Sequence, residues 1–181
     1  MNNGNILNNK KIILESFNKR NYEKVIKLAP KFLKKNNDFQ ILYALSASYL
    51  TLKKYLEAEK CFKRIILLKP TAENYYIYGN IQKQLKNYNE ASQFFLEAIN
   101  LKSDYSEAYN NLGNTKLKLG FIDEAIKNYI KAINANKNNL QAYFNLAHLY
   151  NEEKDFKNLK KVLLDILKLD ESNTTALNDL G

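Results

Sequence analysis

Residues 106–139 read SEAYNNLGNTKLKLGFIDEAIKNYIKAINANKNN, and this pattern recurs along the chain at intervals of about 34 residues. Three further stretches align with it, beginning at Phe39, Ala72 and Leu140. The shared order is a large apolar residue, a small residue, a turn, an aromatic residue and a second small residue. A repeat of this length predicts an array of small supersecondary units that stack side by side.

The apolar residues within one unit predict two helices. Tyr109, Leu112 and Gly113 fall at helical intervals, Gly120 interrupts the pattern, and Ile122 resumes it. We therefore expect two amphipathic helices joined by a tight turn. Gly120 lies just past the first helix, where a residue without Cβ adopts the left-handed conformation at little cost.

Small residues mark the place where the two helices of a unit should cross. Gly113 and Ala125 occupy this place, because only small side chains let helix axes approach to the near end of the usual range. A leucine at either position would overpack the contact at a cost of about 1–3 kcal/mol.

Extended to the whole chain, the pattern predicts ten helices and the start of an eleventh. Their expected ranges are 6–18, 22–36, 39–52, 55–68, 72–85, 88–101, 106–119, 122–135, 140–153 and 156–169, with the last beginning at 174. Residues 6–38 form a degenerate first unit, and Pro30 within its second helix should kink or split that helix. An atypical terminal repeat is suited to capping an array.

The repeated pattern resembles the tetratricopeptide repeat. Matching residues are Leu42, Leu45, Ser46, Tyr49, Tyr55, Ala58, Phe62 and Pro70; Tyr75, Gly79, Tyr88, Ala91, Phe95 and Ala98; Tyr109, Leu112, Gly113, Ala125, Tyr129 and Ala132; and Tyr143, Leu146, Ala147, Tyr150 and Phe156. Lys116 and Gln82 depart from it by replacing a tyrosine, and Leu159 by replacing the crossing alanine.

The resemblance implies an all-α, right-handed α-solenoid of antiparallel helix pairs, with about five repeats and the start of a sixth. We expect one array over residues 1–181, with repeats at 6–38, 39–71, 72–105, 106–139, 140–173 and, truncated, 174–181. In the truncated repeat Leu177, Leu180 and Gly181 take the aromatic, Leu and Gly places. We therefore expect the chain to be a fragment of a longer one.

Composition is that of a soluble protein, with 181 residues of which 45% are hydrophobic and 26% charged. The longest apolar stretches, such as RIILL, are far shorter than a membrane span of about 18 residues or more. The first residues lack the basic start and apolar core of a signal peptide. Cys61 is the one cysteine, which excludes a disulfide framework within the chain. We expect a cytoplasmic location.

Positive charge is concentrated in the first part of the chain. Residues 1–70 carry 15 lysines and arginines against 5 aspartates and glutamates, whereas residues 71–181 carry 13 against 14. This region could contact nucleic acid or an acidic surface. Nearly all of the cations are lysines, however, and nucleic-acid readers favour arginine. We therefore interpret the excess as compositional and do not expect a nucleic-acid partner.

The sequence offers no set of residues for catalysis, metal binding or cofactor binding. His148 is the one histidine, so neither a histidine pair for a metal nor a catalytic triad can form. The glycines serve the repeat pattern and form no phosphate-binding loop. We therefore expect neither a cofactor nor enzymatic activity in these residues.

The resemblance places a binding surface on the first helix of each unit, which lines the concave face of such arrays. The residues at the family's ligand-facing places are Tyr43, Tyr76, Asn80, Asn110, Asn111, Asn114, Phe144, Asn145 and His148. Asparagine side chains can both donate to and accept from a peptide backbone. Aromatic residues between them would supply apolar pockets. We expect a protein or peptide partner.

Two sub-types of the family can be compared at these places. The clamp for the carboxylate tail of heat-shock chaperones needs cations where this chain has Tyr76, Gln141 and Asn145, so we do not expect that partner. The asparagine ladder of the O-GlcNAc transferase superhelix is matched in part, by Asn111 and Asn145.

Two functions therefore stay open at this point. The first is a non-catalytic scaffold that binds a partner polypeptide in its concave groove. The second is the substrate-recognition arm of a larger enzyme, such as an O-GlcNAc-type glycosyltransferase, with its catalytic domain beyond Gly181.

Overall fold

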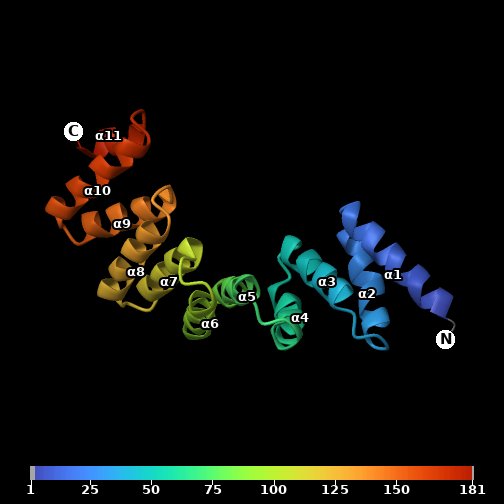
Figure 1. The fold of residues 1–181 in the computed structure, drawn as a ribbon. Helices are drawn as coiled ribbons and strands as arrows, with labels where there is room; N and C mark the ends of the chain where they lie inside the picture. The colour runs from blue at the N-terminus through green and yellow to red at the C-terminus, as the bar shows by residue number, and fades with distance from the viewer. Residues whose placement is uncertain (1–2, 181) are drawn as a thin grey trace. The chain divides into compact units, whose positions relative to one another are not determined.

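The structure is a computed structural model that describes residues 3–180, and these residues form eleven α-helices and no β-strand. The helices are α1 (Asn3–Asn18), α2 (Tyr22–Leu33), α3 (Phe39–Thr51), α4 (Tyr55–Leu68), α5 (Ala72–Gln84), α6 (Tyr88–Leu101), α7 (Ser106–Lys118), α8 (Ile122–Ala135), α9 (Leu140–Glu152), α10 (Phe156–Leu169) and α11 (Thr174–Leu180) (Figure 1). The predicted all-α class is confirmed.

Two helices depart from the predicted bounds by three residues, because α1 begins at Asn3 instead of residue 6 and α2 ends early. Helix α2 runs unbroken through Pro30 and ends at Leu33 instead of residue 36, so the proline does not split it, and a kink at Pro30 stays a prediction. Proline removes only one backbone hydrogen bond here, within the last turn of the helix. Asn36 closes that end, because its backbone N–H and its side-chain amide both donate to the carbonyl of Phe32, at 3.1 and 3.0 Å.

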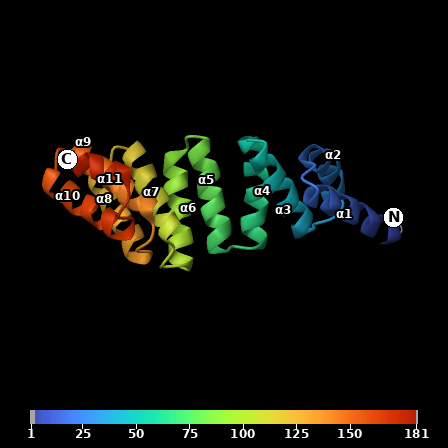
Figure 2. The ribbon, with the colours of Figure 1, turned by 90° about the horizontal axis from the view of Figure 1, so that it is seen from above.

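The helices group into two compact units, one up to Asn87 and the other from Tyr88. In the first unit α3 packs on both α2 and α4 (Figure 2). In the second unit α7 packs on α8 and α9 packs on α10. The first helices of successive pairs also touch, α1 with α3 and α7 with α9. That residues 1–181 form a single array stays a prediction, and residues 1, 2 and Gly181 lie outside the described part.

The predicted crossing of α7 and α8 is confirmed at Gly113. A Cβ on this glycine would lie 2.6 Å from Cε1 of Tyr129 and 3.2 Å from the carbonyl oxygen of Ala125. Tyr129 and Ala125 are themselves buried. The missing side chain of Gly113 is therefore what lets the aromatic ring of α8 pack against the backbone of α7.

The turns that precede α2, α4, α6, α8 and α10 each contain one residue in the left-handed conformation. Gly120 has a φ of 82°, as predicted. The other four turns place a long cationic residue there, with φ between 56° and 63°: Arg20, Lys53, Lys86 and Lys154. These four positions carry backbone strain that a glycine would relieve.

Candidate functional site

The second unit brings six of the nine predicted groove residues onto two helices that contact each other. Asn110, Asn111 and Asn114 lie on α7, and Phe144, Asn145 and His148 lie on α9. Tyr43, on α3, and Tyr76 and Asn80, on α5, belong to the first unit.

Amide side chains link α7 and α9 directly. The Nδ2 of Asn145 donates to Oδ1 of Asn110 at 2.8 Å, and the Nε2 of Gln141 donates to Oδ1 of Asn145 at 3.1 Å. Gln141 is exposed, Asn145 is half-buried and Asn110 is only 7% exposed. A chain of hydrogen-bonded amides therefore leads from the surface into the contact between the helices.

Asn114 is held by the core of the same repeat. Its Oδ1 accepts a hydrogen bond of 2.8 Å from the hydroxyl of Tyr129. Burial raises the pKa of Tyr129 to about 12 because the phenolate would be poorly solvated there. Both Asn110 and Asn114 thus use their carboxamide oxygens within the protein, a role that the repeat pattern did not reveal.

Phe144 and His148 both line a pocket of about 330 Å³ between α9, α10 and α11, which we call the α9 pocket. Its other lining residues are Ala147, Asn151, Leu159, Leu163, Thr175 and Asp179. Apolar side chains come from α9 and α10, whereas α11 contributes a hydroxyl and a carboxylate. Such a mixture of apolar surface and a few polar groups is typical of ligand pockets in general.

The repeat pattern did not mark Leu159, Leu163 and Thr175 as site residues. The departure of Leu159 from the repeat pattern could have identified it, because a leucine stands where the pattern has a small residue at the helix crossing. In the neighbouring repeat the equivalent pair is Gly113 and Ala125, whereas here Ala147 is paired with Leu159. Both members of this bulkier pair line the pocket.

The imidazole and carboxylate groups near the pocket are exposed to solvent. The Nε2 of His148 lies 3.4 Å from Oε1 of Glu152, and both side chains are more than half exposed. An exposed pair of this kind contributes little to stability.

Among residues 3–180 no three side chains of His, Cys, Asp or Glu gather as a metal site would require. None of the helices described has both the length and the apolar character needed to cross a membrane.

The predicted aromatic residue of α3 is partly accessible. Tyr43 is 39% exposed and stacks on Phe39, with ring centroids 6.1 Å apart. Tyr76 and Asn80 are half-buried on α5.

Two family models match the sequence, and one of them alone covers more than half of the chain. One, described as tetratricopeptide repeat, matches residues 39–71, 106–139 and 140–173, and the other, described as TPR repeat, matches residues 79–120. The chain belongs to the tetratricopeptide-repeat family. No curated protein matches the sequence.

Solved structures of tetratricopeptide-repeat proteins share this fold. A crystal structure of MamA protein has a TM-score of 0.84 at 24% identity, with 94% of each chain covered. MamA 41-end from Desulfovibrio magneticus RS-1 has a TM-score of 0.81 at 17% identity, covering 93% of this chain and 97% of its own. YrrB, described as a TPR protein with an unusual peptide-binding site, has a TM-score of 0.77 at 16% identity, covering 93% and 88%.

Proposed function

We propose that this protein is a non-catalytic scaffold that binds a partner polypeptide along the first-helix face of its second unit. This face is the surface of α7 and α9 that carries Asn111, Phe144, Asn145 and His148, together with the α9 pocket. The tetratricopeptide-repeat fold supports the proposal, because stacked helix pairs present extended surfaces for partners.

The observation that carries the proposal is the continuity between the amide chain and the pocket. Asn145 lies on the same helix as Phe144, His148 and Asn151, which line the pocket. A peptide could place one side chain in the pocket while its backbone meets the amides of α9. The peptide-binding site for which YrrB is described is consistent with peptide binding on this fold.

A bound segment would be held by modest contacts. The pocket of about 330 Å³ accepts a single large side chain, and the remaining contacts would be hydrogen bonds at a solvent-accessible surface. We expect a dissociation constant in the range of tens of micromolar to micromolar, or about −6 to −8 kcal/mol. The cytoplasmic location stays a prediction from the sequence.

Peptides selected from a phage-displayed random library on the full chain provide the test. His148 and Asn151 are both exposed, so the double substitution H148A/N151A should leave the fold intact and reduce the affinity of the selected peptides by about tenfold. The matched control is Glu152→Ala, which removes the exposed partner of His148 and leaves the pocket lining unchanged. Equal binding by H148A/N151A and the parent chain would refute the assignment of this face.

A further inference from the structure

A second pocket, of about 370 Å³, lies in the first unit on the side formed by second helices. Pro30, Leu33 and Lys34 border it from α2 and the residue after it, and Glu57, Lys60, Cys61 and Arg64 border it from α4. Its floor is α3, through Leu42, Leu45 and Tyr49. It is therefore separate from the first-helix face proposed above.

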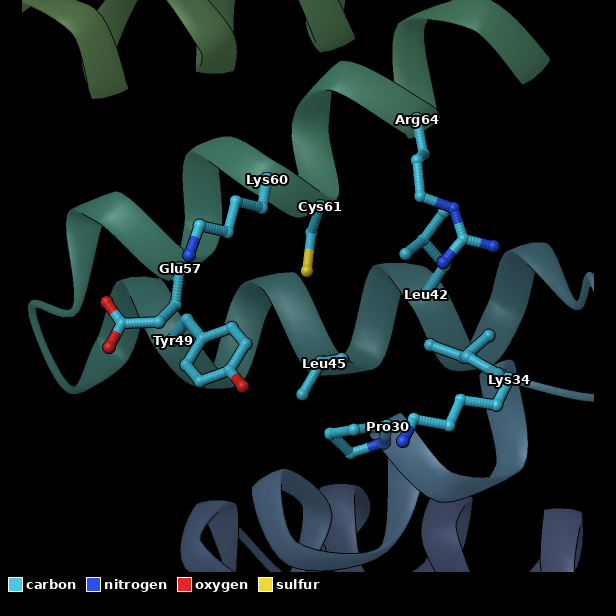
Figure 3. A pocket seen from close by; sticks show the side chains of 10 residues that line it. Pro30, Lys34, Leu42, Leu45, Tyr49, Glu57, Lys60, Cys61 and Arg64 are labelled. Atoms are coloured by element: carbon cyan, nitrogen blue, oxygen red, sulfur yellow. The ribbon is translucent and has the colours of Figure 1, made fainter.

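The interior of this pocket is mainly apolar, and its rim carries three cations and the carboxylate of Glu57. Figure 3 shows Cys61, Leu45 and Pro30 at the centre, Arg64 and Lys34 toward one end, and Tyr49 and Glu57 toward the other. Leu42 and Leu45 are buried beneath the opening, whereas Lys34, Lys60 and Arg64 are exposed. A large apolar side chain could enter the centre while an acidic group meets the rim.

The cations at the rim are available for an incoming acid. Among residues 3–180, no carboxylate forms an ion pair with Lys34, Lys60 or Arg64. The Nη2 of Arg64 donates to Oδ1 of Asn37 at 3.0 Å, which uses one of the five N–H donors of the guanidinium and holds it in place. A held guanidinium suits the two oxygens of a carboxylate.

The chain contains a natural counterpart of this pocket in which an acidic residue stands in the place of Arg64, although Lys137 and Lys161 also line it. In the second unit a pocket of about 290 Å³ is lined by Tyr143, Leu146 and Tyr150 of α9, at the repeat positions of Leu42, Leu45 and Tyr49. Val162 stands there in the place of Cys61, and Asp165 in the place of Arg64. Asp165 is paired with Lys168 at 2.7 Å. The two pockets are therefore built from equivalent helices but carry opposite charges at the repeat position of Arg64 and Asp165.

We infer that the first-unit pocket binds a partner polypeptide segment that presents one large apolar side chain beside an aspartate or glutamate. The apolar side chain enters between α2 and α4 above Leu45, and the carboxylate pairs with Arg64 and Lys34. The surplus of cations over residues 1–70 adds a general attraction for such a segment. Nucleic acid suits the pocket less well, because its phosphates would leave the buried apolar floor without a partner.

Charge reversal is the first test. From a phage-displayed random library, peptides that bind the full chain are selected, synthesised with a fluorescent label and titrated against K34E/R64E. A class of peptides with Asp or Glu beside Leu, Ile or Phe should lose affinity by about tenfold or more. The matched control, K137E/K161E, makes the same change of two reversed cations in the second-unit pocket, and H148A/N151A changes the first-helix face. Both controls should leave this class bound.

The single cysteine gives a direct measure of occupancy. Cys61 is 7% exposed and its sulfur faces the pocket, so a bound side chain should shield it from iodoacetamide. Burial raises the pKa of Cys61 to about 11, so the reactive thiolate is scarce, and the slow reaction is followed at about pH 8.5, where the lysines of the rim keep their charge. The acidic peptide should slow alkylation several-fold. In C61S/V162C, whose thiol lies in the second-unit pocket, it should have no effect.

Several results would overturn the inference. These are a selection without an acidic and apolar class, equal weakening by K137E/K161E, or alkylation of Cys61 that the peptide does not slow. Stronger competition by a single-stranded oligonucleotide than by the peptide would indicate a nucleic-acid site instead. Self-association abolished by K34E/R64E would indicate that the occupant is a second copy of the chain. Loss of binding in H148A/N151A alone would support the proposed function and refute this inference.

Discussion

Gly113 and Tyr129 pack so closely that a Cβ on the glycine would lie 2.6 Å from the edge of the aromatic ring. The ring cannot retreat freely, because Tyr129 is buried and its hydroxyl is bonded to Asn114 at 2.8 Å. The close contact between α7 and α8 thus depends on the absence of a Cβ at Gly113 and on the fixed position of the Tyr129 ring.

Gly113→Ala should destabilise the protein by about 1–2 kcal/mol. The overpacking cost of about 1–3 kcal/mol exceeds the gain of up to about 1 kcal/mol from replacing a helical glycine by alanine. Urea denaturation followed by circular dichroism measures the difference. In a Tyr129→Leu background the same substitution should cost less, because the ring is gone. A stabilised G113A variant would contradict this packing.

The left-handed turn residues predict stability changes of opposite sign for substitutions at Lys53 and Gly120. Lys53→Gly should stabilise the fold by about 0.5–1 kcal/mol, because relief of left-handed strain outweighs the added chain entropy of glycine. Gly120→Ala should destabilise it by about 1 kcal/mol. Thermal and urea unfolding of both variants measures these effects.

Asparagine provides the control for the turn. Gly120→Asn should cost less than Gly120→Ala, because asparagine tolerates the left-handed conformation better than other residues with a side chain. Equal losses in the two variants would show that backbone conformation is not the cause.

The amide chain predicts an energetic coupling between α7 and α9. Asn145→Ala should cost about 1–3 kcal/mol, since it leaves the buried Oδ1 of Asn110 without its donor. Gln141→Ala, at the exposed end of the chain, should change stability by less than about 0.5 kcal/mol. A double-mutant cycle between positions 110 and 145 should give a coupling energy, and additive effects would argue against the hydrogen bond.

Ionisation of Tyr129 should lower stability at alkaline pH. Its folded pKa of about 12 lies above the ordinary value of 10, so the folded state holds the proton more tightly than the unfolded state. The stabilisation is therefore complete below pH 10, and it falls by about 1.4 kcal/mol per pH unit between pH 10 and 12. Unfolding free energies measured across this range should fall more steeply for the parent chain than for Tyr129→Phe. Parallel curves would contradict the buried, protonated tyrosine.

The helix bounds were largely predictable because repeated apolar spacing determines which residues become buried. The predicted and observed bounds of α4, α6, α8 and α10 coincide. The end of α2 could not be read in this way, because it depends on the two hydrogen bonds that Asn36 makes to Phe32. The sequence also placed Gly113 at the crossing, although it could not identify Tyr129 as the ring that fills the space.

The candidate site was less predictable than the fold. Repeat positions placed Asn110 and Asn145 on the same face, but whether such amides bond to each other depends on side-chain rotamers and on the distance between α7 and α9. The pockets are gaps between helices of different repeats. Spacing within one repeat gives no information about their width, and so the pocket above Leu45 was not foreseen.

Mapping a selected peptide onto the chain by nuclear magnetic resonance tests the proposed function most directly. The uniformly ¹⁵N-labelled chain is titrated with a peptide whose binding requires His148 and Asn151, and backbone amide shifts are followed. We predict that the largest changes fall on α9 around Phe144, Asn145 and His148, and extend to α11. Changes confined to second helices, with α7 and α9 unaffected, would contradict the proposed function.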